Sequence, residues 1–387
     1  MMTGVVLILF CIVYLHLRIV DNNIPLPLQS PSSRSYLLSS ILQSPPSPRD
    51  QILSSLHSTQ PDTVVASKWW KKFLCKSLPD NTTNSQFTLP LLFRDTQPTR
   101  TDYNVFLLDT ACNTHPKYRA WCSVESWARQ NPNLDVWYLL TSPTADNTDH
   151  LLTHLLHHYP NLNLATLDLD KIFHDLPVNK LFNSRRWTRV DTWPVEVLSN
   201  MLRASVLWHW GGVYSDTDVI SIKPFTIPVN AVGLENKGVV ASAFLSFTKN
   251  NPVLWALMKD MNTHFEPNKW GCIGPQAVTR VIRSVCKNDT TKLDIPKDGK
   301  PQTCNNITIY PSQFFSPIYY KNFKAYISGG GGKNFEKDFS NTFLMHFWNK
   351  ITKNVVVKAG SGSIYDVAAK KSCPVTYQMA TLRANHF

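Results

Sequence analysis

Residues 211–220 read Gly-Gly-Val-Tyr-Ser-Asp-Thr-Asp-Val-Ile, so that two carboxylates, those of Asp216 and Asp218, interrupt an apolar run. The apolar flanks predict an extended core segment, in which buried charges need compensation. Residues two apart in an extended chain leave the same face, so both carboxylates could approach one ion. Carboxylate oxygens suit Mn²⁺ or Mg²⁺ rather than zinc. The stretch therefore predicts a divalent-cation site, although an Asp-x-Asp triplet alone is more often a solvated turn.

A helix is predicted directly before this stretch. It begins at Pro194, a residue type favoured at the first helical position, and apolar residues recur at helical spacing as far as Trp210. Gly211 and Gly212 end the helix, because glycine tolerates the left-handed conformation of a helix C-cap. The acidic pair thus follows the end of a helix at the start of a new core segment.

Strand and helix signals alternate farther upstream. Strands are predicted for residues 105–108, 136–140 and 162–167, with helices at 119–130 and 151–156 between them. This order predicts an α/β fold with a parallel sheet and helices on both faces. Ligands of such sheets bind beyond the carboxyl ends of the strands. Asp109, which follows the first predicted strand, is therefore a candidate binding residue.

The N-terminal part of the chain predicts a membrane attachment. Residues 1–4 would form a cytoplasmic tail, 5–20 an apolar signal anchor and 21–100 a stem that begins rich in Pro and Ser, before a catalytic domain at 101–387. The apolar run is shorter than the roughly 20 residues of a typical spanning helix. A cleaved signal peptide is therefore the alternative, although no small-residue cleavage pattern follows the run.

The cysteines beyond the apolar run predict an oxidising compartment. Of the eight cysteines, seven lie after residue 20, and they could form three disulfides and leave one thiol. Cys286 and Cys304 flank a polar segment that suits a local disulfide, and a bridge between Cys112 and Cys122 is a second possibility. Cysteine spacing alone leaves the connectivity open. Three glycosylation sequons agree with secretory passage: Asn81, Asn288 and Asn306.

The charge distribution argues against a nucleic-acid partner. The formal net charge is +12, but Lys and Arg are scattered, with no basic run longer than a pair. We interpret them as a solvated basic surface suited to anionic substrates or lipid headgroups.

From Phe106 nearly to the C-terminus, the chain resembles the family of α1,4-glycosyltransferases that includes lactosylceramide 4-α-galactosyltransferase and α1,4-N-acetylglucosaminyltransferase. The resemblance rests on an ordered set of short blocks, and the order makes it specific. These blocks are residues 122–126, 198–199 with 203, 211–220, 243–245, 270–271, 274–276, 279–280, 346–349 and 373–374.

This resemblance implies a GT-A fold, type II topology in the Golgi membrane, and transfer from a UDP-sugar with retention of anomeric configuration. It implies that Asp216 and Asp218 are the catalytic pair, with Asp218 a direct ligand of Mn²⁺ or Mg²⁺ and Asp216 in contact with ribose and metal. His346 is a candidate third metal ligand, with a satisfied core histidine as the alternative. The expected nucleotide-sugar contacts are Asp109, Arg203, Asp216, Gly274, Gln276, His346 and Trp348.

Two departures from the family pattern bear on specificity. Asn200 stands where the family usually has Asp, and Ala241-Ser242 replaces Asn-Gly. The predicted function is transfer of a hexose, galactose in the first instance, from UDP to a glycolipid such as lactosylceramide. The alternatives are N-acetylgalactosamine or N-acetylglucosamine as the sugar, or a catalytically weakened relative that only binds sugar or UDP. No residue is identified as a nucleophile.

Overall fold

The computed structural model describes residues 68–76, 86–287, 293–296 and 298–387. The predicted tail, the predicted anchor and the stem up to residue 67 lie outside these ranges, as do Asn81 and Asn288, and those expectations stay predictions. Within the described ranges, no helix is long and apolar enough to cross a membrane.

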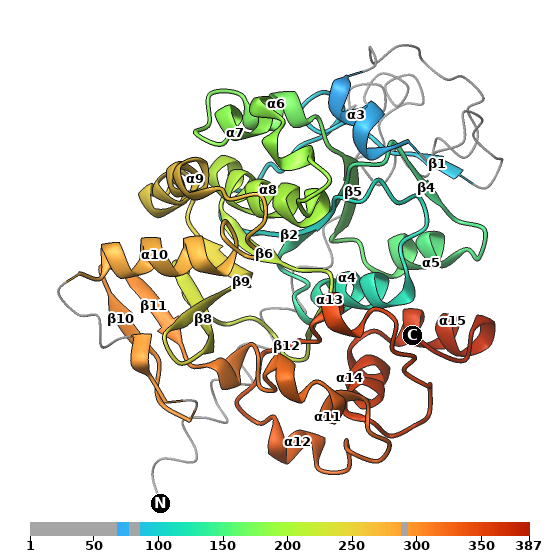
Figure 1. Cartoon of the computed structure of the whole chain (residues 1–387). Helices are drawn as coiled ribbons and strands as arrows, with labels where there is room; N and C mark the ends of the chain where they lie inside the picture. The colour runs from blue at the N-terminus through green and yellow to red at the C-terminus, as the bar shows by residue number, and fades with distance from the viewer. Residues whose placement is uncertain (1–67, 77–85, 288–292, 297) are drawn as a thin grey trace, which may run out of the picture. The chain divides into compact units, whose positions relative to one another are not determined.

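An eight-stranded mixed sheet forms the centre of the described fold, in the order β10-β11-β8-β9-β6-β2-β3-β5 (Figure 1). The neighbours β5, β3, β2 and β6 are parallel, as predicted for the first strands, whereas β9 and β10 run antiparallel to their neighbours. The strands are β2 (Asn104–Asp109), β3 (Asp135–Leu140), β5 (Leu162–Thr166), β6 (Gly212–Ser215), β8 (Ala231–Asn236), β9 (Val239–Phe247), β10 (Gln302–Cys304) and β11 (Ile307–Tyr310).

Helices cover both faces of this sheet, which confirms the predicted layers. Alternate residues of a strand point to opposite faces, and in β2 Phe106 joins the core under α8 (Pro194–Trp210), α9 (Pro252–His264) and α10 (Pro275–Val285). Val105 joins the opposite core, under α4 (Tyr118–Gln130) and α5 (Leu151–His158). Shorter helices complete the described fold: α6 (Leu169–Phe173), α7 (Asn179–Ser184), α11 (Lys324–Ile327), α12 (Phe335–Asp338) and α13 (Asn349–Thr352).

The helix α8 has the predicted bounds, and glycine ends it for a steric reason. Gly211 has φ +67 and Gly212 φ +109, both in the region that glycine favours. A Cβ added to Gly212 would lie 2.2 Å from the carbonyl oxygen of Asn104. Only glycine therefore allows β6 to begin directly beside β2.

The acidic stretch differs from the predicted single extended segment. β6 ends at Ser215, and Asp216 to Asp218 form a turn in which Val219 N donates to Asp216 O at 3.2 Å. The chain then enters β7 (Val219–Ser221), which pairs with β12 (Leu344–His346) in a separate antiparallel sheet. The extended geometry was wrong because the chain leaves the central sheet at this point, and the turn brings the two carboxylates together.

Residues before position 101 already belong to the fold. Trp70, in α3 (Trp69–Leu74), is fully buried in the core beside α8, and Cys75 forms a disulfide with Cys112. β1 (Gln86–Thr88) pairs with β4 (Thr144–Asp146). The described residues of the range assigned to the stem therefore pack on the domain predicted for residues 101–387.

Three disulfides occur among the described cysteines, and Cys272 is a buried free thiol. The predicted Cys286–Cys304 bridge is confirmed. The bridge suggested between Cys112 and Cys122 is wrong, because Cys122 lies on α4 and pairs with Cys373 at the start of the C-terminal helix.

A buried carboxylate holds the same helix. Glu125, fully buried on α4, accepts hydrogen bonds from the backbone N–H groups of Val375 and Thr376 at 2.9 and 2.7 Å and from the Tyr159 hydroxyl at 2.7 Å. Val375 and Thr376 lie in the first turn of α15 (Pro374–Arg383), which follows α14 (Ile364–Ser372). The carboxylate therefore satisfies N–H groups that a helix leaves unpaired.

Replacing Glu125 with Gln should lower the free energy of unfolding by about 1–3 kcal/mol, because the amide nitrogen cannot accept from the N–H it would face. Urea denaturation with the disulfides intact measures the loss. Glu336→Gln is the matched control, since Glu336 pairs with Lys371 at the exposed surface and such pairs contribute at most about 1 kcal/mol. Equal losses in the two variants would contradict the capping role.

Candidate functional site

A cleft of about 850 Å³ opens at the carboxyl ends of β2 and β6. The chain order of the strands reverses between these two neighbours, since β3 and β5 lie on one side of β2 and β6 lies on the other. Open α/β sheets bind their ligands at such switch points. Asp109 ends β2 and Asp216 directly follows β6, so both reach the cleft from the sheet itself.

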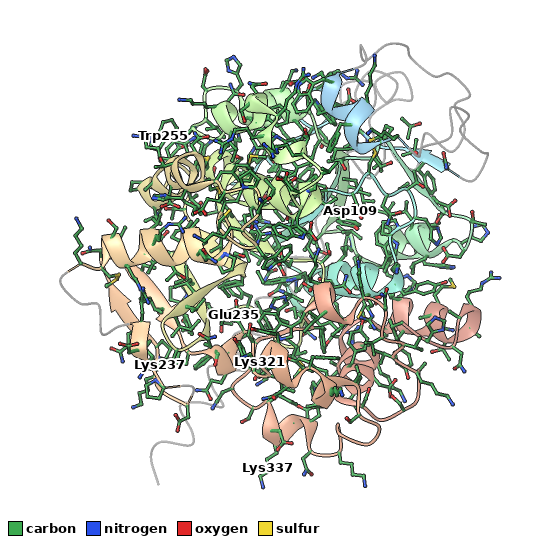
Figure 2. The ribbon with its side chains drawn as sticks, viewed as in Figure 1. Asp109, Glu235, Lys237, Trp255, Lys321 and Lys337 are labelled. Atoms are coloured by element: carbon green, nitrogen blue, oxygen red, sulfur yellow. A yellow bond between two sulfur atoms is a disulfide. The ribbon has the colours of Figure 1, made fainter. Side chains whose placement is uncertain are left out.

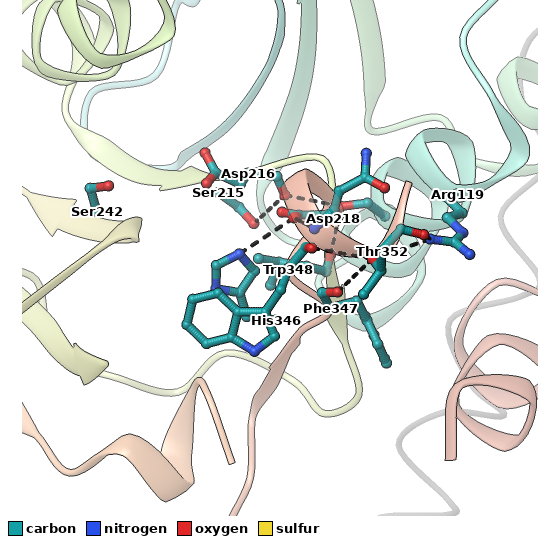
Figure 3. Close-up of polar contacts among 12 residues, drawn as sticks. Arg119, Ser215, Asp216, Asp218, Ser242, His346, Phe347, Trp348 and Thr352 are labelled. Atoms are coloured by element: carbon teal, nitrogen blue, oxygen red, sulfur yellow. Dashed lines mark hydrogen bonds and ion pairs between the residues drawn. The ribbon is translucent and has the colours of Figure 1, made fainter. Parts of the chain in front are cut away.

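Asp216, Asp218 and His346 converge in this cleft, with one potential ligand atom of each within 4.8 Å of the others (Figure 3). His346 is far from the two aspartates in the sequence. The pairing of β12 with β7 brings it beside them, because His346 of β12 lies opposite Val219 of β7. His346 Nε2 lies 3.4 Å from Asp218 Oδ2, which also accepts from the backbone N–H of Asn349 at 2.5 Å. Two carboxylates and an imidazole form a donor set that fits a divalent cation.

Electrostatics favours opposite charges on Asp218 and His346. Burial alone would raise the pKa of Asp218, but attraction to His346 and the N–H of Asn349 bring it below the usual value. Burial would lower the pKa of His346, but the negative charges of Asp218, Asp216 and Glu235 raise it. Since only neutral imidazole binds a metal, a cation at this site would compete with protonation of His346.

Asp216 is held by a buried arginine and a tyrosine. Arg203 lies 3.3 Å from Asp216 Oδ1, and the hydroxyl of Tyr214 donates to the same oxygen. Arg203 also donates to the carbonyl of Ser242 at 2.5 Å and to Ser199 Oγ at 3.0 Å, and its guanidinium stacks 4.5 Å from the centre of the Tyr214 ring. Arg203 is thus engaged with protein groups and fixes the orientation of Asp216.

The predicted site residues gather at one place, with one exception. Asp109, Arg203, Gln276 and Trp348 line the cleft together with the three potential metal ligands. Gly274 is not among the lining residues, and a Cβ there would lie 3.0 Å from Asn200 Oδ1. Gly274 therefore lets the first residues of α10 approach α8. The individual roles of all these residues stay predictions.

Other lining residues carried no motif in the sequence. Glu235, at the end of β8, reaches the cleft from the hairpin with β9 (Figure 2), and burial raises the pKa of its carboxyl, an effect that the charge of His346 reduces. Lys350 also lines the cleft, where it pairs with Glu196 at 2.6 Å and lies 4.6 Å from the centre of the Trp270 ring. The sequence did not indicate the contacts of Lys350, because they depend on tertiary structure. It did not indicate Glu235 either, because Glu-Asn-Lys-Gly at residues 235–238 is typical of an exposed turn.

Known proteins match the chain in the regions that form this site. Residues 117–238 match a family model described as glycosyltransferase sugar-binding region containing DXD motif, and residues 246–380 match one described as alpha 1,4-glycosyltransferase conserved region. The first match contains Asp216 and Asp218, and the second contains His346. Both fall on the blocks that carried the predicted resemblance.

Two curated relatives are similar over most of their length. Lactosylceramide 4-alpha-galactosyltransferase of Rattus norvegicus is 30% identical over 284 residues, which cover 72% of this chain and 76% of that protein. Alpha-1,4-N-acetylglucosaminyltransferase of Homo sapiens is 27% identical over 281 residues, covering 71% and 79%. Among solved structures, the WbbM bifunctional glycosyltransferase has a TM-score of 0.41 at 11% identity, and the match covers 76% of this chain and 54% of that one.

Replacing Asp218 with Asn should weaken Mn²⁺ binding by at least about tenfold, because it removes one charge from the donor set. The loss of the electron paramagnetic resonance signal of free Mn²⁺ on titration with protein measures the affinity. Asp175→Asn, which neutralises an exposed carboxylate outside the cleft lining, should bind Mn²⁺ as the wild type does. Equal affinities of the Asp218 variant and the wild type would exclude this cation site.

Asp109 should make stability depend on pH. Burial raises the pKa of its carboxyl to about 6, against the hydrogen bond that the backbone N–H of Ala111 donates at 3.0 Å. The folded state then binds more protons than the unfolded state between about pH 4 and 6, so stability falls as pH rises through this window, by roughly 1.4 kcal/mol per unit of pKa shift.

Urea denaturation of wild type and Asp109→Asn at pH 4.5, 5.5 and 7 tests this linkage. The variant should lose less stability over that interval, because the titrating group is gone, whereas Asp175→Asn should follow the wild type. Parallel curves for Asp109→Asn and wild type would refute the raised pKa.

Proposed function

Because the chain belongs to the family of α1,4-glycosyltransferases, we propose that it transfers a hexose from a UDP-sugar to an acceptor glycan, with a divalent cation as cofactor. The convergence of Asp216, Asp218 and His346 in one cleft at the switch point of the sheet carries this proposal. The proposal includes a GT-A arrangement, an α1,4 linkage and retention of anomeric configuration.

The nucleotide would lie across the carboxyl ends of β2 and β6. Asp109 would contact the nucleoside, and Asp216 would contact the ribose and the cation. Asp218 and His346 would be the remaining ligands of Mn²⁺ or Mg²⁺, which would supply positive charge beside the departing diphosphate. Gln276 and Trp348 reach the same cleft and are the further donor contacts that we propose.

The chain's own groups preorganise this arrangement. Arg203 and Tyr214 hold one oxygen of Asp216, and the N–H of Asn349 holds one oxygen of Asp218. Both carboxylates are therefore oriented before a donor binds, which reduces reorganisation during transfer. We assign no nucleophile.

We propose galactose as the donor sugar and a glycolipid such as lactosylceramide as the acceptor, with N-acetylgalactosamine and N-acetylglucosamine as the alternative sugars. The departures from the family pattern lie at the cleft, where Asn200 and Ala241 are lining residues. The Asn200 side-chain oxygen is buried and has no hydrogen-bond partner among the described residues. These two positions also motivate a second candidate, a protein that binds UDP-sugar without turnover.

For its location we propose the Golgi membrane, with residues 1–4 cytoplasmic, residues 5–20 as a signal anchor and the catalytic domain in the lumen. The disulfides Cys75–Cys112, Cys122–Cys373 and Cys286–Cys304 support an oxidising compartment.

UDP release by the full chain in detergent tests the activity. UDP-galactose, UDP-N-acetylgalactosamine and UDP-N-acetylglucosamine are each offered with Mn²⁺, with and without lactosylceramide. We expect acceptor-dependent release from one donor and a fall of at least about 100-fold in Asp218→Ala, since the cation's charge stabilisation is lost. Product analysis by NMR should then show an α1,4 linkage.

Glu336→Gln is the control for the Asp218 variant, because its carboxylate lies in an exposed ion pair. UDP binding without release from any donor, in the presence of each acceptor tried, would favour the binding-protein alternative.

A further inference from the structure

The cleft lining includes Glu235, in the β8–β9 hairpin, and an aromatic wall formed by Tyr319, Tyr320 and Trp348. We propose that these residues form the acceptor subsite, in which the Glu235 carboxylate accepts hydrogen bonds from hydroxyls of the terminal acceptor sugar. This inference rests on the proposed function and names a residue that would decide which acceptor is used.

The position of Glu235 suits contact with a ligand better than a role in stabilising the fold. It lines the cleft and is mostly shielded from solvent, yet it forms no hydrogen bond or ion pair with any residue that the structure describes. Register shifts interrupt the β8–β9 ladder between Val232 and Leu234 and again between Leu234 and Asn236. Such irregularities are typical beside active sites, where they redirect a side chain. A shielded carboxylate that accepts no hydrogen bond is costly unless a ligand supplies donors.

The aromatic wall suits a pyranose ring. The ring centres of Trp348 and Tyr320 are 5.8 Å apart and those of Tyr319 and Tyr320 4.3 Å apart. The indole N–H of Trp348 donates to the carbonyl of Ile318 at 2.9 Å, which fixes the ring. All three aromatic side chains are only partly buried. Aromatic faces that pack against the C–H face of a sugar, with a few polar groups to fix its orientation, are the usual makeup of such a pocket.

The order of the strands distinguishes acceptor from donor. In the sheet, β8 and β2 lie on opposite sides of β6, which leads into the cation ligands. A nucleotide that extends from Asp109 on β2 to the cation leaves the β8 side of the cleft for the second substrate. A carboxylate there would repel a diphosphate and accept from the hydroxyls of a neutral sugar. Glu235 therefore fits the acceptor better than the phosphates.

The test measures the affinities of Glu235→Gln for the acceptor and for UDP separately. This substitution keeps the side-chain volume but removes the charge. The full chain is assayed with Mn²⁺, its active UDP-sugar and an alkyl β-lactoside as the acceptor. We expect the KM for the lactoside to rise about tenfold or more, as for a lost hydrogen bond to a charged group. The affinity for UDP in the presence of Mn²⁺, measured by calorimetry, should change by less than about twofold.

Two further variants separate recognition from general effects. Tyr320→Leu, which removes part of the aromatic wall, should also raise the KM for the lactoside. Glu336→Gln neutralises an exposed carboxylate that lies outside the cleft lining and pairs with Lys371. This variant should keep the wild-type KM for the lactoside, which would show that the loss of one negative charge alone does not raise this KM.

An unchanged KM for the lactoside in Glu235→Gln would overturn the acceptor assignment. A loss of UDP affinity as large as the rise in KM would overturn it too and would place Glu235 at the donor. Failure of the proposed function is distinct, because the wild-type chain would then release no UDP on addition of the lactoside.

Discussion

The pairing of β7 with β12 is the constraint on which the site depends. It places His346 opposite Val219, and therefore beside Asp218, although the two segments are far apart in the sequence. The segment after β12 is fixed in turn by Arg119 of α4, which donates to the carbonyls of Thr352, at 2.8 Å, and Val355 (Figure 3). The three potential metal ligands thus come from the turn after β6 and from a C-terminal segment that α4 supports.

Local chemistry made much of the fold predictable from the sequence. Pro194 and Gly211 mark the ends of α8 because proline fits the first helical turn and glycine fits the cap. The buried strand at Phe106 could be identified because a parallel strand with both faces covered is continuously apolar. The position of Asp109 and Asp216 in a binding cleft could be predicted, because open α/β sheets bind their ligands beyond the carboxyl ends of the strands.

What could not be predicted depends on contacts between distant segments. The turn at Asp216 to Asp218 exists because β7 pairs with β12 outside the central sheet, and no local sequence pattern predicts that pairing. The partners of Cys112 and Cys122 depend on which helices meet, and the cleft position of Glu235 depends on an irregular ladder. His346 and Trp348 could be anticipated only through a resemblance to a family, since a histidine in an apolar segment is more often a core residue.

The Cys122–Cys373 bridge closes a covalent ring over a sequence separation of 251 residues, and Asp216, Asp218 and His346 all lie inside this ring. During synthesis the two acidic residues leave the ribosome well before the histidine, and Cys373 follows last of all. The candidate cation site can therefore form only after residue 346 has been made, and the disulfide that encloses it only after residue 373. A premature stop codon anywhere between positions 219 and 373 would leave the Asp-x-Asp triplet intact but would remove Cys373, and the disulfide with Cys122 could then not form.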